Sequence, residues 1–460
     1  MKADLLIVGG TLVTEHEAFF ADLAVADGRV AAVLAPGQVS AGDLETAAVI
    51  DATGQYVLPG LVDAHVHFNE PGRTHWEGYA TGSAAAAAGG ITTFLDMPLN
   101  NDPPTLDAES LAVKVAAVAD KSVVDYGLWG GIVPDNLGLL GGLRDGGVVA
   151  AKAFMCHSGL DGYPGVDDAA LFGALRRGAE LGMIVGLHAE SDGLTTTLGA
   201  EAQTAGKQEP RDWANSRPAF TEVEPVRRAL YLAGETGASV HFVHVSTPAA
   251  VREVNAARAR GVSATLETCP HYLALDEDDL ARLGPYGKCA PPLRPRALVD
   301  ELWHQVLAGH IDLIASDHSP CPPADKDKGL DDIWQAWGGL HGVQTLLPVL
   351  LTDGVHKRKM PLPLLVRLTS ATPARRYGLY PQKGALLVGS DADITLVDLR
   401  GEPWTLDAAM LKTRWPVSPF LGKQFFGRVT TTLVRGTVVH RDGEITAAPG
   451  FGQRVLPSWA

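Results

Sequence analysis

Two histidines close an apolar segment that has the composition of a β-strand. They are His65 and His67 in the run LVDAHVHFNEPGR. Residues i and i+2 of a strand point to the same face, so both imidazoles converge on one point. Further potential ligands follow later strand-like segments: Lys152, His188, His244 and Asp317. This combination of residue types predicts a metal site.

Histidine and aspartate ligands suit a divalent cation such as zinc, manganese or cobalt, and the absence of cysteine from the set argues against a closed structural zinc site. Lys152 needs a special explanation, because its ammonium would be repelled by a metal cation. Two unit positive charges ~4 Å apart repel each other by about 4 kcal/mol at an effective dielectric of ~20. Deprotonation would remove the charge. Carbamylation by CO2 would go further and create a carboxylate-like anion able to bridge two metals. We therefore expect two divalent ions, zinc before manganese or cobalt, and N6-carboxylysine at position 152.

Two such ions can share a bridging hydroxide, lower the pKa of its parent water and polarise a carbonyl oxygen. Asp317 can take a proton as the nucleophile attacks and pass it to the departing nitrogen. The predicted chemistry is hydrolysis of an unreactive amide, with Asp317 as the catalytic residue.

Each residue alone has a simpler explanation. An HxH pair in a strand can be structural, Lys152 could be an ion-paired or snorkelling lysine, and Asp317 could be a turn or cap residue. What distinguishes the metal hypothesis is the position of all the candidates relative to the predicted strands.

From about residue 56 to 385, apolar runs alternate with helical stretches, a pattern typical of a parallel sheet covered by helices. The predicted strands are 56–67, 91–98, 124–133, 147–155, 182–190, 238–246, 263–273 and 311–318. Eight βα units predict an α/β fold with a closed (β/α)8 TIM barrel, and an open doubly wound sheet is the alternative. Barrel enzymes carry their chemistry at the C-terminal ends of strands, where the candidate ligands fall.

Two connections between the predicted strands stand out. After the sixth strand, Thr247 can N-cap a helix that Pro248 opens and Gly261 ends. Segment 191–223 is the longest βα connection, and we expect it to form a wall or lid of the site.

Both ends of the chain have the composition of short β-strands, over 5–34, 392–399 and 428–445, and the run LIVGGTLV at 6–13 loosely resembles TLVRGTVV at 432–439. We predict that 1–55 and 386–460 together form a β-sandwich beside the barrel domain, 56–385. Two unrelated terminal sheets are the alternative.

Composition narrows the functional classes. The formal net charge of −15 disfavours nucleic acid or an anionic membrane as a partner. The N-terminal apolar run is too short for a secretory signal, and no stretch approaches the ~20 apolar residues of a membrane span. The 4 cysteines show no CxxC spacing, so we interpret them as free thiols and expect a cytoplasmic protein.

The chain resembles the cyclic amidohydrolases, a branch of the amidohydrolase superfamily, over essentially its whole length. The motifs run from GGTLV and PGLVDAHVH through KAFM, GLHAE, HFVHVS, ETCPHY, APPLR and SDHSP to GSDADITLVDL. The resemblance implies a (β/α)8 barrel with a β-sandwich built by both termini. It also implies that the HxH pair and the last aspartate hold one metal, that the two later histidines hold the other, and that carboxylated Lys152 bridges them.

Residues near the metals distinguish the members of the family. Dihydroorotases typically have an arginine where this chain has Asn69, and hydantoinases a tyrosine where it has His157. The run from 69 to 105 is most similar to allantoinases, which implies hydrolysis of the small molecule allantoin to allantoate in purine breakdown. A hydantoinase or dihydropyrimidinase is the alternative, and a non-catalytic scaffold homologue is the alternative from another class.

The family also implies substrate contacts and an assembly state. Backbone groups near Cys289, Ala290 and Gly338 would bind the ring, with Asn69 and His157 as further candidate contacts. Many allantoinases carry serine where this chain has Ala290, a change that backbone contacts would tolerate. Relatives are often tetramers, so we expect a homotetramer.

Overall fold

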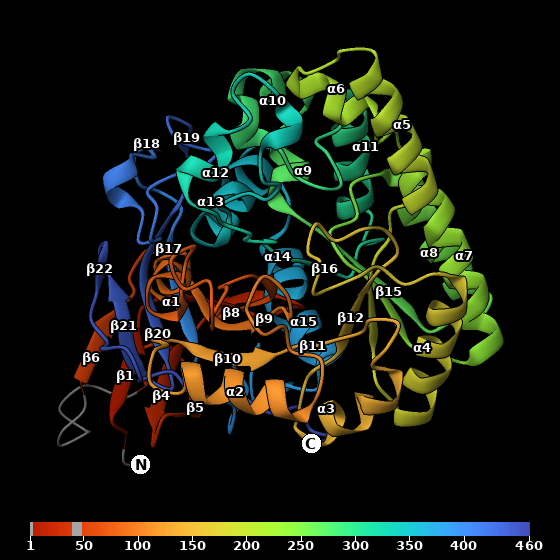
Figure 1. Cartoon of the computed structure of the whole chain (residues 1–460). Coiled ribbons are helices and arrows are strands. Elements are labelled where there is room, and N and C mark those ends of the chain that lie inside the picture. Colours follow the sequence, from red (N-terminus) through yellow and green to blue (C-terminus); the bar gives the residue numbers. More distant parts are fainter. Residues whose placement is uncertain (1–2, 39–47) are drawn as a thin grey trace.

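The computed structural model describes residues 3–38 and 48–460. Parallel strands alternate with helices through the central part of the chain and close into a barrel (Figure 1). The barrel strands are β8 Leu61–Val66, β9 Ile91–Asp96, β10 Asp125–Leu128 with its continuation β11 Gly130–Gly131, β12 Ala151–Phe154, β13 Val185–His188, β14 Val240–Phe242, β15 Ala264–Thr268 and β16 Leu313–Ile314. A parallel bridge between Val66 and His318 joins the last strand position to the first. The predicted (β/α)8 barrel is confirmed.

Every residue of β8 and β9 is buried, as expected for parallel strands that are covered on both faces. The helices around the barrel are α1 Tyr79–Ala88, α2 Ala108–Val118, α3 Leu140–Asp145, α4 Asp168–Leu181, α7 Phe220–Thr236, α8 Pro248–Ala259, α11 Arg296–Leu307, α14 Leu362–Val366 and α15 Thr372–Arg376. Shorter helices occupy the connections: α5 Asp192–Thr204, α6 Pro210–Asn215, α9 Pro270–Ala274, α10 Glu277–Leu283, α12 Pro323–Asp327 and α13 Leu346–Val349.

Helix α8 forms as its sequence predicts. The Thr247 side chain accepts a hydrogen bond from the Ala250 N–H, Pro248 occupies the first turn, and Gly261 has a positive φ of 91° just beyond the helix. Because only glycine adopts this backbone conformation without strain, the chain can leave the helix there.

The two termini meet in a β-sandwich, drawn in red and blue beside each other in Figure 1. One sheet has the order β5-β4-β1-β6, with β5 Arg29–Leu34, β4 Asp22–Ala26, β1 Leu5–Val8 and β6 Ala48–Asp51. The other has the order β22-β21-β20-β17-β7-β2-β3, with β22 Glu444–Ile445, β21 Thr437–Arg441, β20 Arg428–Val434, β17 Ile394–Asp398, β7 Tyr56–Pro59, β2 Thr11–Val13 and β3 Ala18–Phe20. N- and C-terminal strands therefore share one sheet.

The predicted strand 56–67 is divided between the two layers. Its first part, β7, pairs with β17 and β2 in the sandwich, and its second part, β8, is the first barrel strand. Gly60 lies between them, where an added Cβ would be only 2.2 Å from Thr92 Oγ1. The passage from sandwich to barrel therefore requires glycine.

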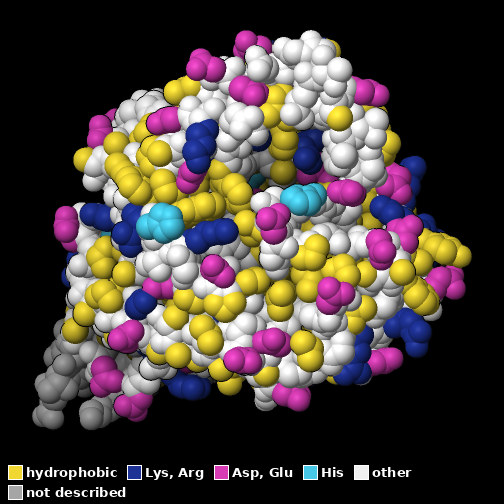
Figure 2. Space-filling view, in the orientation of Figure 1, with side chains coloured by type: hydrophobic (Ala, Val, Ile, Leu, Met, Phe, Trp, Pro, Cys, Tyr) yellow, Lys and Arg dark blue, Asp and Glu magenta, His cyan; other side chains and the backbone are white. Residues whose placement is uncertain are grey.

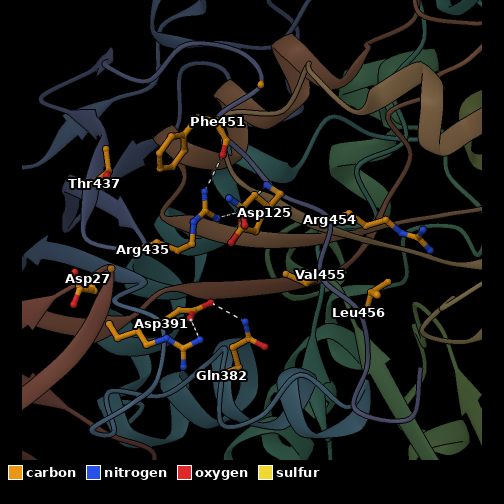
Figure 3. Close-up of a pocket in the computed structure, with 14 residues that line it drawn as sticks. Asp27, Asp125, Gln382, Asp391, Arg435, Thr437, Phe451, Arg454, Val455 and Leu456 are labelled. Carbon is orange, nitrogen blue, oxygen red and sulfur yellow. Dashed lines mark hydrogen bonds and ion pairs between the residues drawn. The ribbon is translucent and has the colours of Figure 1, made fainter.

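The C-terminal tail fastens the sandwich to the barrel. Tyr126 of β10 donates its N–H to the Gln453 carbonyl at 3.0 Å. Arg435 donates both to Asp125 and to the carbonyl of Phe451, and these groups border a cavity of about 750 Å³ (Figure 3). Beneath them, the buried Lys383 ammonium is ion-paired with three aspartates, Asp125, Asp391 and Asp393.

Three further observations concern the surface, the cysteines and the hydropathy of the helices. Figure 2 shows acidic and basic side chains interspersed with apolar ones on the face that it draws. All four cysteines are buried free thiols: Cys156, Cys269, Cys289 and Cys321. Among the helices of the described residues, none is both long enough and apolar enough to cross a membrane.

Candidate metal centre

Most of the predicted ligands lie at or just beyond the C-terminal ends of their barrel strands, and Lys152 is the second residue of its strand. His65 is near the end of β8, Lys152 lies within β12, and His188 is the last residue of β13. His244 and Asp317 lie in the loops that follow β14 Val240–Phe242 and β16 Leu313–Ile314. The barrel topology thus brings residues 252 positions apart in the sequence, from 65 to 317, to one end of the molecule.

One group of side chains gathers around His65. Its Nε2 lies 3.3 Å from Nε2 of His67, 3.2 Å from Oδ1 of Asp317 and 3.0 Å from Nζ of Lys152. Nε2 of His67 is 3.5 Å from the same Asp317 oxygen. These atoms converge on one point, as the i, i+2 spacing predicts.

A second group contains the two later histidines. His188 Nδ1 lies 2.9 Å from His244 Nε2. The ring of His244 is centred 5.4 Å from that of His65, so the two groups adjoin. The structure therefore brings together all the residues that the sequence predicts as metal ligands.

Burial makes the centre electrostatically unusual. Desolvation, reinforced by the Lys152 charge, lowers the pKa of His65 to about 3. Desolvation also lowers the pKa of Lys152 to about 8, despite the opposing effects of Asp317 and Glu267. Burial alone would raise the pKa of Asp317, but the neighbouring histidines, His65 first, hold it well below its usual value. The centre therefore favours neutral imidazoles, an amine that readily loses its proton and an ionised carboxylate.

Glu267, on β15, supports this centre from behind. Its Oε1 lies 2.5 Å from Nδ1 of His65 and accepts the backbone N–H of His244 at 3.3 Å. Its Oε2 lies 3.1 Å from Nε2 of His241. A carboxylate in this position fixes the proton on Nδ1 of His65 and leaves the Nε2 lone pair directed at the centre.

Glu190 supports the other group. Its Oε2 lies 2.9 Å from Nε2 of His188 and 3.0 Å from Nη1 of Arg217. Burial raises the pKa of this carboxyl, but Arg217 and His188 outweigh burial and bring it to about 2. Glu190 follows His188 by two residues, a spacing from which its placement on the same face could have been predicted.

The backbone is strained at the centre itself. His244 and Asp317 have positive φ values of 39° and 44°, and Asn69 and Asn100 nearby have 62° and 69°. Non-glycine residues adopt this region rarely, and such strain collects at functional sites. The conformation turns the His244 and Asp317 side chains inward just after their strands end.

A cavity of about 350 Å³ opens over the metal centre. Four residues predicted to contact substrate line it: His157, Cys289, Ala290 and Gly338. Asn69 does not, because it is fully buried and directed toward the Pro320 carbonyl, and Asn100 occupies the wall instead. Segment 191–223 supplies Trp213 and Arg217, so it forms part of the wall as predicted.

Cys269 and His271 lie beside the predicted ligands, although the sequence alone did not predict either as a metal ligand. His271 and Cys269 offer ligand atoms close to Asp317, and Nε2 of His271 has no hydrogen-bond partner among the described residues. Desolvation lowers the pKa of His271 to about 4, so its ring is neutral near pH 7.

Comparison with known proteins shows the family of this chain. Residues 56–439 match the family model described as the amidohydrolase family. The chain is 47% identical over 449 residues to an allantoinase of Deinococcus radiodurans, covering 98% of each, and 41% identical over 444 residues to allantoinases of Escherichia coli strains, covering 96% of each.

Solved structures extend the comparison to three dimensions. The structure titled L-hydantoinase (dihydropyrimidinase) from Arthrobacter aurescens has a TM-score of 0.95 and 37% identity, covering 99% of this chain and 100% of that one. A D-hydantoinase structure has a TM-score of 0.91 and 30% identity, with 99% of each chain covered.

Proposed function

The chain belongs to the amidohydrolase family, and we propose that it hydrolyses the cyclic amide of allantoin to allantoate. The observation that supports this most is the convergence of the predicted ligands beneath one cavity, in a chain matched along its whole length by allantoinases. A small, polar, cyclic diamide suits a cavity of about 350 Å³ lined by histidine, amide and backbone groups.

The donor set fits two divalent ions. Pairs of ring nitrogens lie 3.3 Å and 2.9 Å apart, a close approach that needs a proton or a cation between them. Two bonds of ~2.1 Å at a tetrahedral angle also place histidine nitrogens about 3.4 Å apart. We propose one ion at His65, His67 and Asp317 and another at His188 and His244, with carboxylated Lys152 between them.

When bound, the two ions would lower the pKa of a water molecule and polarise the ring carbonyl. Zinc suits these ligands, and manganese and cobalt are compatible with them. The depressed pKa of Lys152 supports its carboxylation, because only the neutral amine reacts with CO2.

Asp317 is the proposed proton carrier. It stays ionised because its histidine neighbours keep its pKa low. It can therefore accept a proton from the attacking water and donate it to the ring nitrogen as the C–N bond breaks. Replacing it with asparagine should lower kcat far more than it raises KM.

Backbone N–H groups are the proposed substrate contacts. Within the described part of the chain, the N–H groups of Cys289, Ala290 and Gly338 donate to no other residue, although all three residues line the cavity. They are free to bind the carbonyl oxygens of the ring. The His157 side chain accepts from the Gly159 N–H through Nδ1, so its Nε2 can carry a proton toward the cavity.

A cytoplasmic location and a homotetrameric state complete the proposal. Four buried free thiols suit a reducing compartment. The tetramer is a prediction from the family resemblance, and size-exclusion chromatography with light scattering measures it directly.

A substrate panel tests the proposed function. Enzyme loaded with zinc, manganese or cobalt is assayed with allantoin, dihydrouracil, 5-substituted hydantoins and dihydroorotate, and its metal content is measured in parallel. We expect allantoin to give the highest kcat/KM with about two metals per chain. Activity confined to dihydrouracil or hydantoins would favour the second candidate, a hydantoinase, which the TM-score of 0.95 to the Arthrobacter structure supports.

A further inference from the structure

Two lysines beside the cavity are buried, and their ammonium groups donate to backbone carbonyls instead of pairing with carboxylates of the described residues. Lys288 is 4% exposed and Lys326 is 2% exposed. The Lys288 ammonium donates to the carbonyls of Ile333 at 2.8 Å, Trp334 at 3.3 Å and Ala336 at 2.7 Å. All its donors are therefore used on one short segment, which contains the 3-10 helix Ile333–Gln335.

The Lys326 ammonium completes the arrangement. It donates to the carbonyls of Trp337 at 2.8 Å, Gly339 at 2.7 Å and Lys288 at 3.3 Å. The two lysines thus hold five carbonyls of segment 333–339, and Lys326 also ties that segment to position 288. The N–H of Gly339 donates back to the Lys288 carbonyl at 2.9 Å.

Neither ammonium has a carboxylate within salt-bridge distance among residues 3–38 and 48–460. Burying an unpaired ammonium is costly, and desolvation accordingly lowers the pKa of Lys288 to about 7 and that of Lys326 to about 8. Two such groups side by side indicate that the carbonyls they hold need a fixed position.

The segments they join are those that face the substrate cavity. Cys289 and Ala290 form one side, and Ala336 to Gly339 form another. Trp213 extends the arrangement, because its ring lies 4.3 Å from the Lys288 ammonium and its Nε1 donates to the Cys289 carbonyl at 2.9 Å. Since the carbonyls are occupied by lysine and tryptophan donors, the neighbouring N–H groups remain available to a ligand.

We propose that Lys288 and Lys326 are positioning residues that align the 288–290 and 336–339 backbones, so that their free N–H groups bind the carbonyl oxygens of the cyclic diamide. This inference rests on the proposed function. It assigns the alignment of the ring-binding backbone to two lysines, of which Lys288 borders the cavity and Lys326 lies behind it, and it separates ring binding from the metal centre.

The main test is Lys326→Met, which keeps most of the side-chain volume and removes the three donors. Lys328→Met is the matched control, because Lys328 lies two residues away, is exposed and, within the part of the chain that the structure describes, is ion-paired only with Asp325. For Lys326→Met we expect KM to rise about tenfold, the size of one misplaced neutral hydrogen bond, while kcat changes less than about threefold. Metal content should equal that of the wild type. The control should match the wild type in KM, kcat and metal content.

Hydrogen–deuterium exchange provides a readout that needs no turnover. Faster exchange of the 333–341 backbone in Lys326→Met and in Lys288→Met, with unchanged exchange in the barrel strands, supports the inference. Unchanged KM together with unchanged exchange in 333–341 would overturn it, and so would a loss of kcat at constant KM. If the wild type hydrolyses a different ring from the panel, the proposed substrate fails, and the same KM comparison is made with the ring that it accepts.

Discussion

Glu267→Gln tests whether the metal centre depends on a carboxylate behind its ligands. Glu267 contacts Nδ1 of His65, Nε2 of His241 and the backbone N–H of His244. The glutamine amide can still accept from His65, because His241 can reverse its tautomer against Thr265 Oγ1, 2.8 Å from its Nδ1. The substitution therefore removes the negative charge while keeping the shape and one acceptor.

The magnitude follows from the difference between charged and neutral hydrogen bonds. A hydrogen bond to a charged group contributes about 1.5–3 kcal/mol and a neutral one about 1 kcal/mol, so His65 loses roughly 0.5–2 kcal/mol of support. About 1.4 kcal/mol corresponds to a tenfold change in an equilibrium constant. We expect the affinity for the ion held by His65 to fall about tenfold, within the ~10–100-fold range seen when a ligand's supporting group is changed.

The assay is competition between metal-free protein and a chelator of known zinc affinity, with metal content measured after dialysis. Glu253→Gln on α8 is the matched control, because Glu253 makes an exposed ion pair with Arg227 far from the centre. Wild-type affinity at both sites in Glu267→Gln would refute the reasoning. Equal losses in the variant and the control would refute it as well, because they would show a general effect on folding.

Three further predictions concern a bridge, an ion-pair cluster and a buried histidine. Lys152→Ala should bind one metal per chain instead of two and lose activity without losing the folded far-UV circular dichroism spectrum; full activity would contradict the bridge. Lys383→Met leaves three buried aspartates without their shared cation, so the urea midpoint should fall by the equivalent of about 3–5 kcal/mol, and an unchanged midpoint would contradict it. Desolvation lowers the folded-state pKa of His440 to about 4, below the unfolded value, so its contribution to stability is intact above pH ~6.5 and is lost as the pH falls toward 4. In His440→Gln this loss of unfolding free energy, up to about 3 kcal/mol, should be absent from urea titrations at successive pH values. Parallel wild-type and variant curves of unfolding free energy against pH would contradict this prediction.

The fold and the ligands could be predicted from the sequence because both depend on local periodicity. A strand has a period of two, so the HxH spacing places both imidazoles on one face, and most of the other candidate ligands end or follow a barrel strand. The boundary between the layers was harder to place. Tyr56–Pro59 and Leu61–Val66 are separated in the sequence by Gly60 alone, and the requirement for glycine there depends on Thr92, which is distant in the sequence.

Supporting groups were less predictable because their partners are distant in the sequence. Glu267 meets His65 from 202 positions away, and Lys288 meets the Ile333 carbonyl from 45 positions away. A lysine that binds backbone carbonyls leaves no signal in the sequence of the segment that it holds, since every residue has a carbonyl. Asn69 is the reverse case, a residue that was predicted to contact substrate and does not line the cavity. Its position beside the HxH pair suggests a substrate contact, but its backbone, at φ 62°, turns the side chain into the protein.

The backbone strain at His244 and Asp317 connects the metal ligands with their supporting group Glu267. Both residues follow the last paired residues of their strands and adopt positive φ, which costs roughly 1–3 kcal/mol each in a non-glycine residue. Glycine at either position would relieve the backbone strain, but it would also remove the ligand side chain. Contacts with neighbouring residues must therefore hold a non-glycine residue at positive φ. The contact between the His244 N–H and Glu267 does so at one position, at 3.3 Å. The carboxylate that fixes the tautomer of His65 therefore also holds the strained backbone of His244, which links the two proposed metal positions through one residue of β15.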